Sequence, residues 1–387
     1  MSEEVAIVGI GCTGFKPITP DISYKELMFE AATRAYEDAG GISPRKDIDG
    51  FVTCAEDYWE GHSIFDEFVP DQIGATLRHL FTVSGDGLIG LATGYMLIKT
   101  GQLNTVVVEA HSKLSDVATF TGIVNFGLDP IYNRPLGGHP YYMAGLEMTR
   151  FLHETGNTRE QCAQIVVKNK RNALHNSNAA HGANVTVEDV LQSEPYFHPL
   201  NRLDVSPRAD GGIVMVLASE SYAKKITDQP VWIKGVGWIA DTSYPESREW
   251  SRAIYAELAA DMAYKMAGIR NPQKEVDFAE IDDSFSYKEL QHIEALKLCG
   301  KSKAGKLTEL GETEIDGDIP VNASGGLLGM GYAIEASGSQ RALEAVLQLR
   351  GQAGKHQICD AQTGVAQSWR GIPTATGAVT VLSKEVK

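Results

Sequence analysis

The sequence predicts an α/β fold made of two similar halves. Hydrophobic patterns typical of buried strands alternate with helical patterns along the chain, as expected of a sheet covered by helices. A fifteen-residue segment also occurs twice, at residues 35–49 and 263–277, with seven identical positions. The chain has 387 residues, which suffices for two domains of ordinary size. We therefore expect an N-terminal half at residues 1–225 and a C-terminal half at residues 226–387.

Each element of the first half has a local signal. Residues 5–9, VAIVG, are apolar throughout, which favours a short buried strand. Residues 24–39 have apolar positions at helical spacing and end at two glycines, a common helix stop. Residues 48–53 and 105–110 then favour strands, and residues 88–100 favour a buried helix between them.

The middle of the chain differs from both halves. Residues from about 112 to 210 include the loop-like stretches PLGGHPYYMAGLEM and HPLNRLDVSPRADGG. We interpret this region as an insertion into the first half, where substrate contacts often collect. The two copies of the repeated segment lie 228 residues apart, too far for a solenoid. The repeat therefore indicates one duplicated α/β unit.

Charge and composition argue against several classes of protein. The formal net charge is −15, which disfavours nucleic acid and an anionic membrane surface as partners. No apolar run approaches the roughly 18 residues of a membrane span, and the N-terminus lacks the basic start of a signal peptide. The five cysteines are scattered and form no C-x-x-C pair, so we expect neither disulfides nor a bound metal. These features favour a cytoplasmic protein.

Two glycine-rich turns have the chemistry of a site. Ser84 lies in the turn TVSGDG that opens the helix at 88–100, where unpaired N–H groups and the positive end of the helix dipole stabilise an anion. An ordinary N-cap serine is the alternative. Tyr332 stands in NASGGLLGMGYAIEASG at 322–338, whose five glycines let the backbone approach a ligand closely. A packed tyrosine is the alternative there.

Two further segments contain reactive side chains. A strand-like stretch ends at Asp282 and Asp283, and paired carboxylates can perform acid–base chemistry, although Asp283 could instead cap a helix. Cys359 stands in a turn late in the second half. A free cysteine more often serves as a small apolar residue.

Taken in order, these segments resemble the thiolase superfamily over nearly the whole chain. Residues 322–338 are similar to the family's Asn-x-x-Gly-Gly…Gly-His-Pro…Gly block, and the Ser84 segment is similar to its Cys-x-Ser-Gly nucleophile loop. Residues 282–285, DDSF, resemble the His-Asp-x-Phe strand end of sterol-carrier-type and archaeal thiolases, and residues 202–211 resemble a Leu-x-Asp…Asp-Gly block. The resemblance places Cys359 where the family has its second, acid–base cysteine motif.

The resemblance implies a fold and a site. The thiolase fold has two βαβαβαββ halves in a five-layer α-β-α-β-α sandwich, with the active site where two helix N-termini meet. The catalytic set it implies is Ser84, Asp282, Tyr332 and Cys359, with His139 as a candidate to replace a missing histidine. The substrate- and CoA-binding positions it implies are Gly85, Asp283, Phe285, Asn322, Gly325, Gly326 and Gly364.

The departures from the family pattern leave three functions open. Serine replaces the nucleophilic cysteine at Ser84, and Asp282 and Tyr332 replace histidines; a serine hydroxyl is a poor nucleophile unless it is activated. Thiolysis of a 3-oxoacyl-CoA, with an aromatic or dicarboxylic acyl group included, is favoured by Cys359. Retro-aldol cleavage of a 3-hydroxyacyl-CoA, as in steroid side-chain aldolases, is favoured by Ser84 and Tyr332. A non-catalytic, acyl-CoA-binding subunit is the third.

The resemblance also implies partners. Coenzyme A is expected as a co-substrate, with no covalently bound cofactor. A homodimer is expected, together with a small zinc-ribbon/OB-fold subunit that would complete a heterotetramer.

Overall fold

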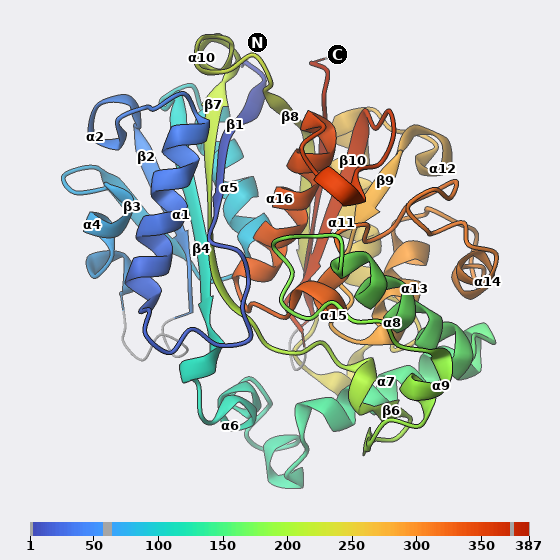
Figure 1. Cartoon of the computed structure of the whole chain (residues 1–387). Coiled ribbons are helices and arrows are strands. Elements are labelled where there is room, and N and C mark those ends of the chain that lie inside the picture. Colours follow the sequence, from blue (N-terminus) through green and yellow to red (C-terminus); the bar gives the residue numbers. More distant parts are fainter. Residues whose placement is uncertain (1–2, 57–63, 372–374, 387) are drawn as a thin grey trace.

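A nine-stranded mixed sheet forms the centre of the computed structural model, which describes residues 3–56, 64–371 and 375–386 (Figure 1). The strand order is β3-β2-β4-β7-β1-β8-β11-β10-β9. The strands are β1 (Val5–Cys12), β2 (Gly50–Cys54), β3 (His79–Val83), β4 (Thr105–Lys113), β7 (Asp210–Ser219), β8 (Val231–Ala240), β9 (Phe278–Glu280), β10 (Thr363–Trp369) and β11 (Thr376–Ser383). A separate hairpin joins β5 (Pro195–Phe197) to β6 (Leu200–Asn201).

The strand order is mirrored about the antiparallel pair of β1 and β8. From β1 outward the order is β7, β4, β2 and β3, and from β8 outward it is β11, β10 and β9. The directions also match, because β1–β7 and β4–β7 are antiparallel like β8–β11 and β10–β11, while β2–β4 is parallel like β9–β10. A parallel bridge from Ala279 to Val321 stands where β3 would fall. The same topology therefore occurs twice.

Both copies of the repeated segment form the same corner. Helix α1 (Tyr24–Asp38) is followed by the left-handed Gly40, and α11 (Ile254–Ala267) by the left-handed Gly268. Glycine adopts this conformation without steric cost and so ends a helix cleanly. A short helix with proline at its first position then leads into a strand, α2 (Pro44–Asp47) before β2 and α12 (Pro272–Glu275) before β9. The exact limits of the two halves remain a prediction.

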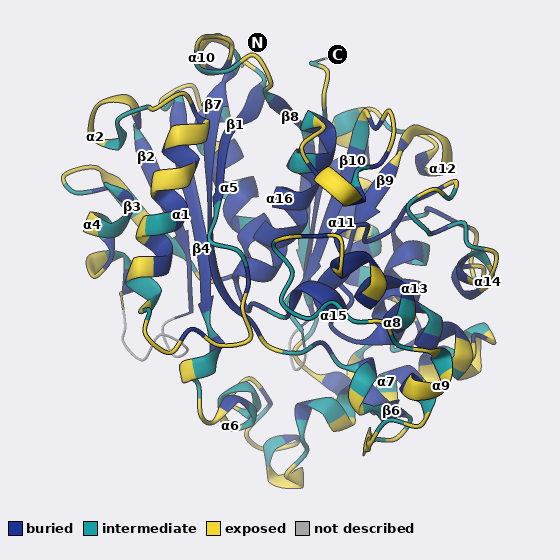
Figure 2. Cartoon of the chain, in the orientation of Figure 1, coloured by how far each residue is buried: buried dark blue, intermediate teal, exposed yellow. Residues whose placement is uncertain are grey.

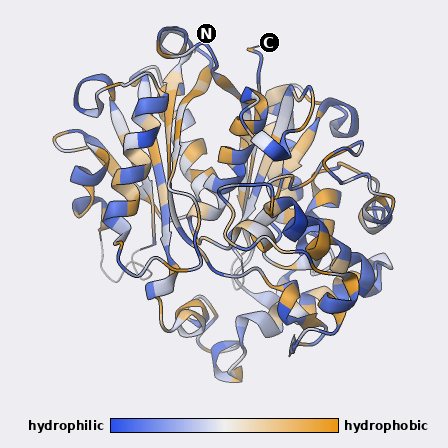
Figure 3. Ribbon diagram, in the orientation of Figure 1, coloured by the Kyte–Doolittle hydropathy of each residue, from blue (hydrophilic) through white to orange (hydrophobic). Residues whose placement is uncertain are grey.

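The helices and the two halves of the sheet stack in five layers. Helix α1 packs on β1, β4 and β7, and α11 packs on β8 and β11. Helices α5 (Gly87–Lys99) and α16 (Ala336–Arg350) contact each other and lie between the two halves of the sheet (Figure 1). Figure 2 shows these central helices buried, whereas α1 exposes its outer face. Apolar residues follow the strands and central helices (Figure 3). The expected α-β-α-β-α order is thus confirmed.

The region between β4 and β7 forms a cluster at one end of the sheet (Figure 1). Its helices are α6 (Phe120–Asn125), α7 (Pro140–Thr155), α8 (Arg159–Ala173) and α9 (Val187–Leu191). Helix α8 packs against α13 (Ser286–Ala295), α14 (Ala304–Glu309) and α15 (Gly326–Met330). The insertion therefore belongs to the first half by sequence but packs mainly on the second half. No described helix has both the length and the apolar character needed to cross a membrane.

The two central helices meet closely at their N-terminal ends. The Gly87 N–H donates to the carbonyl oxygen of Glu335, just before α16, at 2.8 Å. A Cβ atom added at Gly87 would lie 1.9 Å from the Ser339 Oγ. Since Ser339 belongs to α16, only glycine lets the helices approach this far.

We expect Gly87→Ala to lower the free energy of unfolding by about 1–3 kcal/mol, because the new methyl group overpacks the contact between α5 and α16. Urea unfolding followed by circular dichroism measures the change. Gly122→Ala is the matched control, because its nearest neighbour, the Thr119 Cβ, lies 3.9 Å from an added methyl group. Equal stability of Gly87→Ala and the wild type would show that the helices can separate at little cost.

Candidate active site

A cavity of about 270 Å³ opens where the two central helices begin. Its wall combines residues from the first half, the insertion and the second half. Prominent among them are Glu56, Ser84, Phe120, Tyr141, Arg208, Phe285, Tyr332, Trp369 and Arg370. This is the arrangement expected if duplicated units place their helix starts around one substrate.

Ser84 lies in the bend between β3 and α5 and is exposed, and both Ser84 and the buried Gly85 line the cavity. Asp86, rather than Ser84, caps the helix, since its Oδ1 accepts a hydrogen bond from the Leu88 N–H at 2.9 Å. The same oxygen accepts from the Ser368 hydroxyl at 2.6 Å. Burial raises the pKa of Asp86 to about 6, although these hydrogen bonds oppose the shift.

Tyr332 reaches the cavity from the turn that follows α15. Its N–H donates to the Pro207 carbonyl at 2.6 Å, and its carbonyl accepts from the Ala209 N–H at 2.9 Å. Its ring packs edge-to-face on Phe120, with centroids 6.4 Å apart. Burial raises the pKa of the Tyr332 phenol far above its usual range, with nearby Arg370 opposing the shift. The phenol is therefore protonated at neutral pH and can donate a hydrogen bond or a proton.

Arg370, at the end of β10, joins three segments beside the cavity. Its Nε donates to the Glu56 Oε1 at 2.6 Å, and its Nη2 lies 3.3 Å from the Glu335 Oε1. Glu56 follows β2, and Glu335 precedes α16. No motif in the sequence predicted these residues or Trp369 as part of the site. The available signal for Glu56, Trp369 and Arg370 was their position at strand ends, where α/β folds commonly place their sites.

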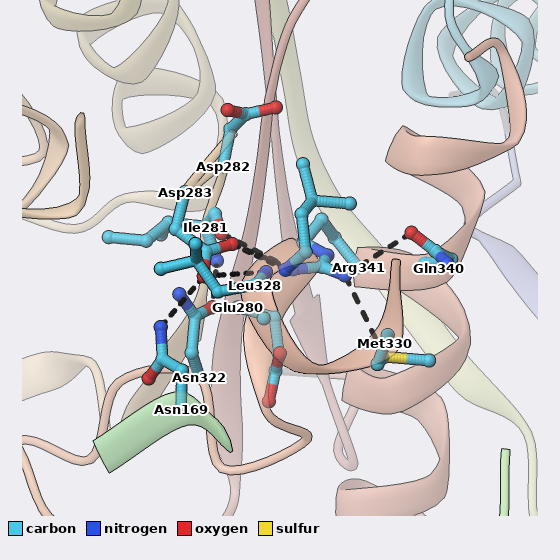
Figure 4. A network of polar contacts seen from close by, with 12 residues as sticks. Asn169, Glu280, Ile281, Asp282, Asp283, Asn322, Leu328, Met330, Gln340 and Arg341 are labelled. Carbon is cyan, nitrogen blue, oxygen red and sulfur yellow. Dashed lines mark hydrogen bonds and ion pairs between the residues drawn. The ribbon is translucent and has the colours of Figure 1, made fainter. Parts of the chain in front are cut away.

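The two adjacent aspartates point in different directions. Asp282 is buried, and its pKa is raised by burial, an effect that hydrogen bonds from Ser284 oppose. The Ser284 N–H donates to the Asp282 Oδ1 at 2.9 Å, and both Ser284 and Phe285 line the cavity. Asp282 itself therefore lies just behind the wall. Asp283 faces the interior, away from the side on which Asp282 points (Figure 4).

Asp283 is the centre of a buried polar network (Figure 4). It accepts hydrogen bonds from the Leu327 and Leu328 N–H groups at the start of α15 and from the Asn169 Nδ2 at 2.7 Å. The Arg341 guanidinium lies 3.7 Å from it. Burial raises the pKa of Asp283 to about 7, which Arg341 opposes. Asp283 thus supports the cavity wall without lining it.

Three other expected binding positions also support the backbone around the network. The Asn322 Oδ1 accepts from the Ile281 N–H at 2.8 Å, and its Nδ2 donates to the Glu289 Oε2 at 2.6 Å. Gly325 and Gly326 have positive φ angles, and an added Cβ would clash with Ala173 and Asp283 respectively. None of the three lines the cavity.

The structure does not bring the remaining expected residues to the cavity. Cys359 is exposed in the turn before β10, and Gly364, near the start of that strand, packs on Phe278. Both lie at the opposite end of β10 from Trp369. His139 caps α7: its Nδ1 accepts from the Tyr141 N–H at 3.1 Å, and its ring stacks on Phe197 at 4.7 Å. It stands behind the wall that Tyr141 forms.

Comparison with known proteins decides the family. An acetyl-CoA acetyltransferase of Methanothermobacter thermautotrophicus is 31% identical over 98% of this chain and 100% of its own length. The chain belongs to the thiolase superfamily. Within it, residues 240–384 match the family described as thiolase C-terminal domain-like. The benzoylsuccinyl-CoA thiolase subunit BbsB of Thauera aromatica is 28% identical over 71% of this chain and 79% of its own length.

A solved structure of an Ltp2–ChsH2(DUF35) aldolase is similar over 100% of this chain and 99% of the compared chain. The TM-score is 0.85 and the sequence identity is 26%. The predicted thiolase fold is therefore confirmed. These relatives support thiolase-type chemistry on acyl-CoA for the superfamily as a whole. Among the described residues, no group of three or more His, Cys, Asp or Glu side chains is arranged to hold a metal ion.

Asp86 should make stability depend on pH. Its pKa of about 6 in the folded state lies above the ordinary value of 3.8. Protonated Asp86 therefore contributes folding stability that is fully present below pH 3.8 and is lost as the pH rises through 6. Asp86→Asn should remove this loss and raise the free energy of unfolding at pH 7.5 by up to about 3 kcal/mol.

Urea unfolding at pH 4, 5.5 and 7.5 measures this effect, with the difference between the two proteins growing across the series. Asp116→Asn is the control, because that side chain is 68% exposed. A constant difference at all three pH values would contradict the assignment to Asp86.

Proposed function

We propose that the cavity cleaves or forms a carbon–carbon bond in an acyl-CoA substrate. The observation that carries the proposal is that Ser84 and Tyr332, from the two halves of the fold, line the same cavity. The start of α5 lies beside that of α16 there, joined by the hydrogen bond from Gly87 to Glu335. Breaking the bond between C2 and C3 of an acyl-CoA leaves an enolate on the thioester oxygen, and this charge must be stabilised in the transition state.

The protonated Tyr332 suits that task. A phenol with a raised pKa can donate a hydrogen bond to the developing enolate oxygen, or a proton to the enolate carbon. Backbone amides at Ser84 and Gly85 are the further proposed donors. The next two amides of α5 are already engaged, since Gly87 donates to Glu335 and Leu88 donates to Asp86.

Thiolase-type acyl transfer from a 3-oxoacyl-CoA to CoA is the first candidate reaction. The acetyl-CoA acetyltransferase relatives support it. In this reaction the Ser84 oxygen attacks the C3 carbonyl, the C2–C3 bond breaks, and the enolate takes a proton to give acetyl-CoA. The thiol of free CoA then takes the acyl group from Ser84. The step requires activation of a serine hydroxyl, which is weakly nucleophilic at neutral pH.

Retro-aldol cleavage of a 3-hydroxyacyl-CoA is the second candidate, and the position of Cys359 outside the cavity favours it. Here the C3 hydroxyl loses its proton, the C2–C3 bond breaks to give a carbonyl product, and Tyr332 protonates the enolate. No covalent intermediate forms, so a serine at position 84 is no obstacle. We propose that Asp282 accepts the C3 hydroxyl proton through the Ser284 hydroxyl, and that this proton returns to the Tyr332 phenolate before the next turnover. The aldolase among the structural neighbours supports this reaction.

We also propose a homodimer, a small zinc-ribbon/OB-fold partner subunit and a cytoplasmic location. The partner subunit is supported by the Ltp2–ChsH2(DUF35) assembly to which this chain is similar. The five cysteines are all free thiols, which fits a reducing compartment.

Dependence on CoA separates the two reactions. The full chain is incubated with a 3-oxoacyl-CoA and with the matching 3-hydroxyacyl-CoA, each with and without free CoA, and the products are measured by mass spectrometry. Acyl transfer requires the oxo compound and CoA, whereas retro-aldol cleavage requires only the hydroxy compound.

Ser84 variants give an independent answer. Ser84→Ala should lower acyl transfer by at least about 10³-fold and Ser84→Cys should raise it, because the first removes the nucleophile and the second improves it. Neither change should affect retro-aldol cleavage by more than about tenfold. Cleavage of neither substrate by the wild type would contradict the proposed function.

Tyr332→Phe should lower kcat by roughly 10²-fold, because it removes the proton donor while keeping the ring contact with Phe120. Tyr196→Phe is the control, since Tyr196 packs on His139 outside the cavity. Because burial raises the pKa of Tyr332, wild-type activity should not decline through loss of this proton between pH 7 and 9. An unchanged kcat in Tyr332→Phe would exclude the phenol from the reaction.

A further inference from the structure

Two arginines line the cavity, and they differ in how their charges are compensated. Arg370 is paired with Glu56 and Glu335. Arg208 makes no ion pair with any carboxylate of the described residues, and its Nη1 makes one long hydrogen bond, to the Val117 carbonyl at 3.4 Å. The cavity wall thus includes one cation with no acidic partner in the described part of the chain.

Arg208 is held at a fixed place relative to Tyr332. Its two neighbours along the chain, Pro207 and Ala209, make the hydrogen bonds to the Tyr332 backbone. Its own carbonyl oxygen lies 2.9 Å from the His181 Nε2. The guanidinium lies over the Phe120 ring, 4.5 Å from the centroid, and the same ring packs on Tyr332. An arginine over an aromatic ring can still offer its N–H groups for a bidentate contact with a carboxylate.

We propose that Arg208 binds a carboxylate at the far end of the acyl group, so that the substrate is an acyl-CoA whose acyl chain bears a second acid group. The inference rests on the proposed function and names the class of substrate. The apolar part of such a chain would lie against Phe120, Tyr141 and Phe285, which line the same cavity. A protein of net charge −15 repels a further anion unless a local cation compensates, and Arg208 supplies that cation.

The phosphates of CoA are the other source of negative charge for this arginine. Arg208 and Tyr332 contact the same Phe120 ring, so Arg208 lies close to the proposed reaction centre. The CoA diphosphate is separated from the thioester by the whole pantetheine arm. An anion near Tyr332 therefore fits the acyl side of the thioester better than the nucleotide side.

Glutaryl-CoA and pentanoyl-CoA test the inference by binding alone, because neither has a 3-oxo or 3-hydroxy group to react. The two esters have chains of equal length and differ only in a terminal carboxylate or methyl group. By isothermal titration calorimetry, the wild-type chain should bind glutaryl-CoA roughly tenfold more tightly. Arg208→Gln should abolish this preference and leave the affinity for pentanoyl-CoA unchanged, whereas Arg208→Lys should keep part of it.

Arg202→Gln is the matched control. Arg202 belongs to the same inserted region and lies over the Tyr196 ring, away from the cavity, so its loss should leave the preference intact. A thermal melt of each variant shows whether it is folded. If Arg208→Gln is unfolded, the Arg208→Lys variant decides, because a carboxylate contact predicts a reduced preference and a bystander predicts the full one.

Two results would overturn the inference while leaving the proposed function intact. One is equal affinity of the wild type for the two esters. The other is an equal loss of affinity of Arg208→Gln for both esters and for free CoA, which would assign Arg208 to the CoA phosphates. Failure of the wild type to bind any CoA ester would instead contradict the proposed function itself, and the two failures are thereby distinguished.

Discussion

The geometry of the cavity depends on the hydrogen bonds and the ion pair that the buried carboxylate of Asp283 makes. A charge in the protein interior must be compensated by hydrogen bonds and by an opposite charge, or it neutralises. Its partners come from α8 through Asn169, from the first turn of α15 and from α16 through Arg341. Asp283 is followed directly by Ser284 and Phe285 in the wall, and α15 leads directly to Tyr332. The contacts to this one carboxylate thus position two parts of the cavity wall, Ser284 with Phe285 on one strand end and Tyr332 after α15.

The same network explains why the insertion packs on the second half. Helix α8 supplies Lys168, whose Nζ bonds the Val321 carbonyl at 2.7 Å and pairs with Glu289. It also supplies Asn169, which donates to Glu289 at 2.6 Å. These groups of the second half are buried, and leaving a buried polar group without a hydrogen-bond partner is costly. The second half therefore completes its part of the cavity wall only when a segment encoded within the first half is in place.

The sequence predicted the features that have local signals. The repeated fifteen-residue segment predicted the duplicated unit, and glycine-rich turns at helix starts pointed to Ser84 and Tyr332 as candidate site residues. It did not predict Arg370, because its partner Glu56 lies 314 residues away, and a position after a strand does not by itself mark a residue of the site. It also placed Cys359 in the site, since a sequence pattern does not say which end of β10 meets the cavity. At His139 the ring nitrogen that suggested chemistry is used to cap a helix.

The two halves of the mirrored sheet differ at their outer edges, and this difference limits how copies of the protein can aggregate. In the described residues β3 pairs on one side only, so its outer backbone groups form an open edge. At the other end, residues 320–322 bond to β9, and the outward N–H and carbonyl of Val321 are taken by Thr313 and Lys168. Growth of a fibril by strand addition needs two open edges on every molecule. In its described residues the nine-stranded sheet has one open edge, so strand addition to this sheet would end at a pair of molecules.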